Sequence, residues 1–180
     1  MPPFFLPQYA DSLGLSTTTG AALVAGFSFA SGVGRIGFGL TADMLGPLNS
    51  LLAALVAGAL STLVLWPVST SLAPLITFVI INGIANGGFF SLMPTVVLSV
   101  FGVSRAPVAM SLIITGWGGG YFAGAPIAGL ILSAFSGGSD SPSLEAYRPA
   151  IFYAGSLSLA AAGLVLLERL SVSRKLLFKA

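Results

Sequence analysis

The chain has 180 residues, of which 56% are hydrophobic and 7% are charged, and its formal net charge is +2. Because about a quarter of the residues of ordinary soluble domains are charged, this composition excludes a soluble globular protein, and the small, scattered positive charge argues against a nucleic-acid partner. The chain has no cysteine and no histidine, which excludes disulfides, thiol nucleophiles and the usual proton shuttle of neutral pH.

Residues 1–7 lack the basic start and the long apolar core of a signal peptide. They are interpreted either as an apolar tail or as the cut end of a helix that began earlier. A first full helix is predicted at 18–40, in a stretch between Asp11 and Asp43 where Arg35 is the only charged residue.

No charged side chain stands between Asp43 and Arg105. Because a helix needs about 20 apolar residues to cross the ~30 Å of bilayer hydrocarbon, this stretch holds two crossings, separated by a connection rich in Pro, Ser and Thr. Two more uncharged stretches follow. The remaining helices are therefore predicted at residues 48–68, 75–100, 107–134 and 149–167. The predicted fold class is all-α integral membrane, with five full transmembrane helices in the lipid bilayer.

Basic residues orient these helices, because cytoplasmic loops carry an excess of Lys and Arg. Arg105 and the four basic residues of the tail at 169–180 share one side, and Arg148 stands alone on the other. This predicts a cytoplasmic C-terminus and, because the number of helices is odd, an outer location for residues 11–17. The tail is interpreted as a flank of the last helix, with lipid binding as the alternative.

Small residues recur at every fourth position in several predicted helices. The series are Ala22, Gly26, Ala30 and Gly34; Ala54, Gly58 and Thr62; Gly116, Gly120, Gly124 and Ala128; and Ala154, Ser158 and Ala162. This spacing keeps each series on one helix face and is typical of close packing in membranes. It favours a tight bundle over a single anchor, with glycine hinges as the alternative. Pro94 and Pro126 are the candidate kinks, because each removes a backbone donor.

Arg35 is the only charge well inside a predicted helix. Its burial at the bilayer centre costs about 2.5–3.5 kcal/mol on insertion scales, so it should face the bundle interior or a wet cavity. One hypothesis is that its guanidinium binds a substrate carboxylate through parallel hydrogen bonds. The other is that it reaches toward the cytoplasmic end or binds helix carbonyls, and the residues alone leave both open.

Asn82 and Asn86 lie at i and i+4 of one predicted helix and therefore share a face. They either join helices through hydrogen bonds worth about 0.6–2 kcal/mol or line a polar passage. Trp117 is expected to pack against other helices, and Trp66 and Tyr147 suit the membrane interface.

Four segments together resemble a known family. They are FFLPQYAD at 4–11, FASGVGR at 29–35, GLTAD at 39–43 and GAPIAG at 124–129. They are similar to the monocarboxylate transporter branch of the major facilitator superfamily, and to its fungal members in particular. The resemblance covers essentially the whole chain and implies helices 7–12 of a twelve-helix carrier, whose two six-helix halves surround a midplane site.

On this mapping, residues 1–180 are the C-terminal half of a transporter, and its N-terminal six-helix half is the missing partner. Residues 1–16 are the end of helix 7 and an outer loop, residues 17–168 hold five transmembrane helices, and residues 169–180 are a cytoplasmic basic tail.

The resemblance implies that Arg35 binds the substrate carboxylate. The family commonly has an Asp one turn earlier, where this chain has Ser31. Because Ser cannot carry a proton, this departure puts proton-coupled uptake in doubt. Ser31, Arg35, Asn82 and Asn86 are the candidate substrate-binding residues.

The expected function is secondary transport of small organic anions, such as monocarboxylates, across the plasma membrane by alternating access, without cofactor or metal. The alternatives are a transport-inactive membrane fragment that acts as an interaction partner and a carrier of a non-carboxylate solute in the same superfamily. A membrane enzyme is disfavoured, because no His, Cys or paired carboxylates lie within the predicted spans.

Overall fold

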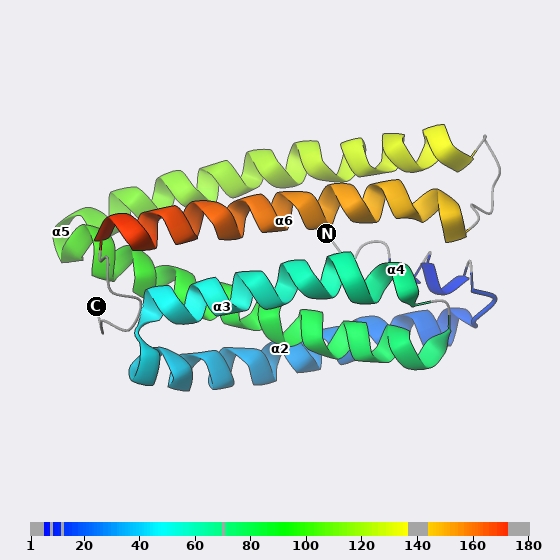
Figure 1. Cartoon of the computed structure of the whole chain (residues 1–180), viewed down its shortest axis with the longest axis horizontal. Coiled ribbons are helices and arrows are strands. Elements are labelled where there is room, and N and C mark those ends of the chain that lie inside the picture. Colours follow the sequence, from blue (N-terminus) through cyan, green and yellow to red (C-terminus); the bar gives the residue numbers. More distant parts are fainter. Residues whose placement is uncertain (1–5, 8, 12, 70, 137–143, 173–180) are drawn as a thin grey trace.

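The computed structural model describes residues 6–7, 9–11, 13–69, 71–136 and 144–172. Within these ranges the regular elements are all helical and lie as long rods side by side (Figure 1). They are α2 (Thr17–Leu45), α3 (Pro47–Leu60), the π-helical segment η1 (Ser61–Leu65), α4 (Trp66–Val68), α5 (Leu72–Ser136) and α6 (Leu144–Val172). The predicted all-α class is confirmed. α3, η1 and α4 continue one another as a single rod.

Among the described residues, four helices are long and apolar enough to cross a bilayer: Thr17–Leu45, Pro47–Val68, Leu72–Ala134 and Arg148–Leu170. The third of these far exceeds the ~20 residues that one crossing needs. α5 is broken at Gly102, which has non-helical dihedral angles of φ 74° and ψ 166°, and the chain reverses there (Figure 1). We call residues 72–101 the first arm and residues 103–136 the second arm. Rods thus occupy the places of the five predicted helices, and a bilayer crossing by each remains a prediction.

The boundaries of α2 follow from local chemistry. The Ser16 hydroxyl accepts a hydrogen bond from the backbone N–H of Thr19 at 3.3 Å and caps the first turn. Gly46 ends the helix with φ 88°, a value that favours glycine, and Pro47 opens α3 at a position where its missing N–H costs nothing. The helix predicted at 18–40 is therefore longer and includes Asp43 in its last turn.

α2 and the first arm touch backbone to backbone. A Cβ built on Gly34 would lie 2.2 Å from the carbonyl oxygen of Ile84, and one built on Gly87 would lie 2.0 Å from the carbonyl oxygen of Ser31. Only glycine permits this approach, which is the close packing that small residues allow in membranes.

The predicted series on the first helix is confirmed only in part at this contact. Ala30 and Gly34 are buried, whereas Ala22 and Gly26 are exposed. The glycines of the first arm that meet α2 are Gly83, Gly87 and Gly88, and they belong to no predicted series.

An aromatic cluster fixes the segment before α2 to the bundle. The Trp66 ring stacks on Phe78 at 5.0 Å and meets the edge of Tyr9 at 6.0 Å. The Tyr9 hydroxyl donates to the carbonyl oxygen of Ser69 at 3.0 Å. Trp66 is only 3% exposed, so its ring packs within the bundle, and its position at the membrane interface remains a prediction. The side chain of Tyr147, predicted for the same role, lies outside the described residues.

The second arm is much less covered. A Cβ on Gly116 or Gly120 would meet nothing within 4 Å, and Phe122 is 88% exposed. The close helix contact predicted from the glycine series of this segment is therefore absent at these two positions.

α6 is held at its far end to the start of α3. Arg169, which is 2% exposed, donates from Nε to the side-chain oxygen of Asn49. Arg169 was predicted to open the tail, but it lies within α6, which continues to Val172. Residues 173–180 of the predicted tail lie outside the described residues.

Candidate functional site

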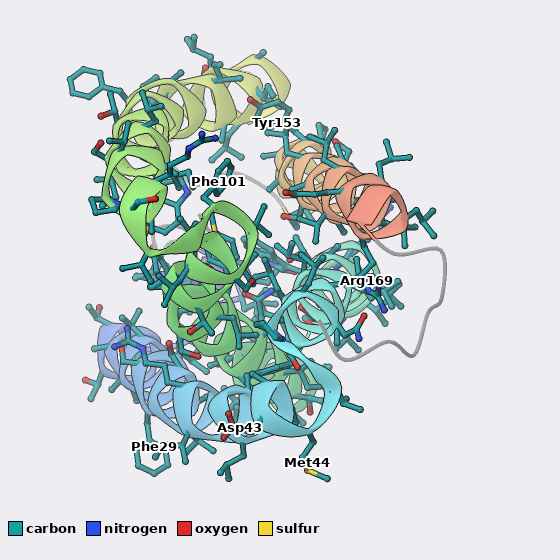
Figure 2. The ribbon with its side chains drawn as sticks, turned by 90° about the vertical axis from the view of Figure 1, so that its left-hand side faces the viewer. Phe29, Asp43, Met44, Phe101, Tyr153 and Arg169 are labelled. Atoms are coloured by element: carbon teal, nitrogen blue, oxygen red, sulfur yellow. The ribbon has the colours of Figure 1, made fainter. Side chains whose placement is uncertain are left out.

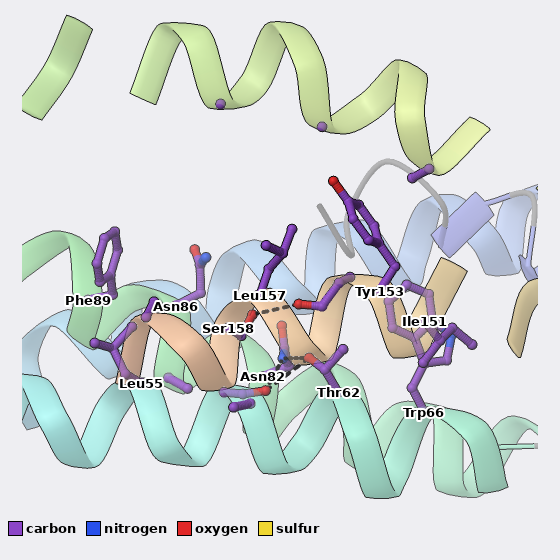
Figure 3. A pocket seen from close by; sticks show the side chains of 18 of the residues that line it. Leu55, Thr62, Trp66, Asn82, Asn86, Phe89, Ile151, Tyr153, Leu157 and Ser158 are labelled. Atoms are coloured by element: carbon purple, nitrogen blue, oxygen red, sulfur yellow. Dashed lines mark hydrogen bonds between the residues drawn. The ribbon is translucent and has the colours of Figure 1, made fainter. Parts of the chain in front are cut away.

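A cavity of about 600 Å³ lies between the α3–α4 rod, both arms of α5, and α6 (Figure 3). Much of its wall consists of small residues: Ala54, Gly58, Gly124, Ala128, Ala154 and Ser158. No Asp, Glu, Lys or Arg stands among the described residues that line it. The volume and the apolar wall are typical of sites that hold a small molecule.

The polar part of the wall is centred on Asn82, in the first arm. Its Nδ2 donates to the Ser61 hydroxyl at 2.7 Å and the Thr62 hydroxyl at 3.0 Å, and it lies 3.3 Å from the carbonyl oxygen of Gly58. Both hydroxyls belong to the π-helical segment η1, a kind of local widening that is frequent at functional sites. The buried cluster joins α5 to the α3 rod at the wall of the cavity.

Asn86 lies one turn beyond Asn82 and also lines the cavity, so the predicted shared face of the two residues is confirmed. It is half-buried, and its amide points toward the second arm (Figure 3). Nearby, Phe89 and Phe90 of the first arm each lie 5.5 Å from Trp117 of the second arm, measured between ring centroids. This aromatic contact confirms that Trp117 packs against another helix, and Phe89 and Trp117 both line the cavity.

Trp66 stands at the other end of the cavity (Figure 3). Its indole Nε1 is buried and has no hydrogen-bond partner in the part of the chain that the structure describes. Tyr153 of α6 lines the wall between the two ends, and its hydroxyl points toward the second arm.

Arg35 and Ser31 lie elsewhere, on α2. Arg35 is exposed, and its backbone carbonyl accepts a hydrogen bond from the Ser91 hydroxyl at 3.4 Å. Ser31 is 7% exposed and lies against Gly87. Of the four predicted site residues, the cavity contains Asn82 and Asn86 and not the other two. Substrate binding by any of the four remains a prediction.

Sequence reasoning missed Trp66, Tyr153 and Thr62 as cavity residues, and it missed the Ser61–Thr62 pair as the partners of Asn82. The adjacent hydroxyls inside an apolar helix were the available signal for the pair. Trp66 offered none, because a tryptophan near a helix end suits an interface equally well. Among the described residues no group of three His, Cys, Asp or Glu side chains could hold a metal ion.

Several known proteins are similar to this chain in sequence. The family model described as the Major Facilitator Superfamily matches residues 1–177. The MFS-type transporter pynF of Aspergillus niger is 38% identical over 136 residues, which cover 74% of this chain and 31% of that protein. The Agnestins efflux protein AgnL12 of Paecilomyces divaricatus is 30% identical over an alignment of 184 positions, which covers 99% of this chain and 39% of that protein.

The Aspyridones efflux protein apdF of Emericella nidulans is 28% identical over 146 residues, which cover 76% of this chain and 28% of that protein. The chain thus spans about a third of the length of the curated relatives it matches.

Proposed function

Because the chain belongs to the major facilitator superfamily, we propose that it forms part of a secondary transporter that carries a small organic molecule across a membrane by alternating access. The family and the apolar helices make it a multi-pass integral membrane protein. The observation that carries the proposal is the match to the family model over residues 1–177. These residues include the helices that enclose the cavity. The relatives named as efflux proteins for agnestins and aspyridones support export as the direction.

The chain acts as the C-terminal half of a twelve-helix carrier, in partnership with an N-terminal six-helix half. The exposed surface of α2 supports this view because it has two different sides. Phe29 and Met44, 77% and 75% exposed, point away from the other helices (Figure 2) and suit acyl chains. Ser28, Gly32 and Arg35, at helical spacing on another side, are also exposed. A guanidinium in lipid is costly, so this small and polar side meets a second half or a watery passage.

The substrate proposed from the sequence is a small organic anion. Arg35 binds its carboxylate through two parallel hydrogen bonds, and Ser31, one turn earlier, shares that face of α2. In carriers built from two repeats, substrate sites lie near the midplane between the halves, which is where an exposed face of one half belongs. Asn82 and Asn86 line the cavity, which Arg35 does not, so the contacts proposed for them with a substrate belong to the cavity.

The test of this assignment is export of lactate from preloaded cells by a full-length carrier that contains the chain. Arg35→Ala abolishes this transport, and Arg35→Lys, which retains the charge but loses the planar fork, transports little. Phe29→Leu, on the lipid side of the same helix, is the matched control and leaves transport and membrane insertion unchanged. Undiminished transport by Arg35→Ala removes Arg35 from the substrate site.

A carrier of a non-carboxylate solute is the second candidate, and the uncharged wall of the cavity favours it. A third is that the 180 residues lack transport activity and act only as an interaction partner. Co-expression with a separate N-terminal half distinguishes that case, because restored transport requires a competent C-terminal half.

The carrier resides in the plasma membrane with its C-terminus in the cytoplasm. The turn between the arms of α5, which precedes Arg105, and the end of α6, which carries Arg169, lie at the same end of the bundle (Figure 1). Two basic sites at one end support the cytoplasmic assignment. Since the chain has no native cysteine, Ser104→Cys labelled by an impermeant maleimide from the cytoplasmic side alone tests it.

A further inference from the structure

We infer that the cavity binds a neutral, largely apolar molecule that donates a hydrogen bond to the Asn82 amide oxygen. The inference rests on the proposed function, because it names the class of molecule that the carrier holds. It differs from the anion assignment in place and in charge, since Arg35 does not line this cavity.

The Trp66 ring is 3% exposed and its Nε1 is fully buried behind its neighbours, so Trp66 contributes apolar ring surface to the wall rather than a donor.

The Asn82 amide supplies the acceptor, and the surrounding hydrogen bonds determine its orientation. The hydroxyls of Ser61 and Thr62 each donate to the Gly58 carbonyl oxygen at 2.9 Å. Each hydroxyl thereby uses its only hydrogen atom, so toward Asn82 it can act only as an acceptor. The NH₂ group of Asn82 is therefore the donor to both hydroxyls, at 2.7 and 3.0 Å. The amide oxygen is turned away from these partners, toward the cavity (Figure 3). A hydroxyl or N–H of a bound molecule is its complement.

The remaining wall selects against charge. A carboxylate in this cavity would lose its hydration and find no cationic side chain among the lining residues that the structure describes, and an unpaired buried charge is strongly disfavoured. The rings of Phe89 and Trp117 at the far end favour an apolar or aromatic body. The volume of about 600 Å³ lies in the range of sites for drug-sized molecules.

The chain offers a direct readout, because it has two tryptophans and both line the cavity. The probes are 4′-bromobiphenyl-4-carboxamide and its carboxylate, which share a ring system and a quenching bromine. Only the carboxamide is neutral and has N–H donors. In the purified 180-residue chain in lipid nanodiscs, the carboxamide quenches tryptophan fluorescence saturably, with an apparent Kd at least tenfold below that of the carboxylate.

Two variants separate binding in the cavity from partitioning into lipid. Ala154→Phe fills the cavity and abolishes saturable quenching, whereas Ala160→Phe, an exposed position outside the wall on the same helix, leaves it unchanged. Asn82→Leu removes the acceptor and keeps a side chain of similar size, so the Kd for the carboxamide rises at least fivefold.

Equal affinity for the two probes, or saturable quenching that survives Ala154→Phe, overturns the inference. The absence of saturable quenching by either probe also overturns it. That result would indicate that another helix, rather than a small molecule, packs against the small residues of the wall. These outcomes do not involve transport. Loss of binding with intact carrier activity refutes the cavity site alone, whereas binding without any carrier activity refutes the proposed function alone.

Discussion

The two glycine-rich faces of this bundle, on either side of the turn at Gly102, have opposite uses. In the first arm of α5, Gly87 meets the backbone of α2 so closely that a Cβ would lie 2.0 Å from the Ser31 carbonyl oxygen. In the second arm, a Cβ on Gly116, Gly119 or Gly120 would meet nothing within 4 Å. Glycine spacing therefore marks a face that another backbone can approach, and the opposite element decides whether the approach occurs.

The strongest way to break this contrast is a large side chain on the tight face. Gly87→Leu forces α2 away from the first arm, and we expect a loss of about 3 kcal/mol of stability, at the upper end of the cost of overpacking. Gly119→Leu, on the open face, is the matched control and changes stability by less than about 0.5 kcal/mol. Unfolding in mixed detergent micelles measures both, and equal losses would contradict the contrast.

The turn between the arms tests the contrast at its boundary. Gly102 has φ 74° and ψ 166°, a region of backbone space that is essentially restricted to glycine and costs other residues about 1–3 kcal/mol. We expect Gly102→Ala to lower stability by about 2 kcal/mol. Gly116→Ala, in the helical part of the second arm, instead gains about 0.5–1 kcal/mol of helix propensity. A neutral Gly102→Ala variant would show that the turn does not need a glycine.

A smaller effect compares the two asparagines on the cavity face. Asn82→Ala leaves the hydroxyls of Ser61 and Thr62 without their donor, and we expect a loss of about 0.6–2 kcal/mol, the range for hydrogen bonds between membrane helices. Asn86→Ala, for which no hydrogen bond is found among the described residues, should cost less than half as much. Unfolding of the two variants side by side checks the ranking, and a larger loss for Asn86→Ala would reverse it.

Sequence reasoning predicted the rods well, because a helix that crosses a bilayer needs a long apolar stretch, and the uncharged stretches of the sequence show where such helices fit. Arg105 also indicated the reversal that the structure places at Gly102. The pairing of rods could not be predicted, because Gly34 finds its partner at Ile84 and many residues could have stood opposite it. The cavity was equally hidden, since the Asn82–Ser61 bond joins residues 21 positions apart in different rods.

The candidate site shows the same limit. The shared face of Asn82 and Asn86 followed from helical spacing alone, and both line the cavity. The burial of Trp66 depends instead on Tyr9 and Phe78 from two other segments. Local patterns predict which residues share a face, but only the arrangement of helices determines what that face meets.

The central claim is that the chain belongs to a carrier with a watery passage along the Arg35 side of α2. Labelling of single cysteines by a membrane-impermeant maleimide in the full-length carrier tests it most directly, since the chain has no native cysteine. Ser28 and Phe29 are both exposed and, as consecutive residues of α2, project about 100° apart, Ser28 on the Arg35 side and Phe29 on the lipid side. We predict that Ser28→Cys is labelled from either side of the membrane and Phe29→Cys from neither. Equal labelling of the two, or none at Ser28→Cys, would contradict the account.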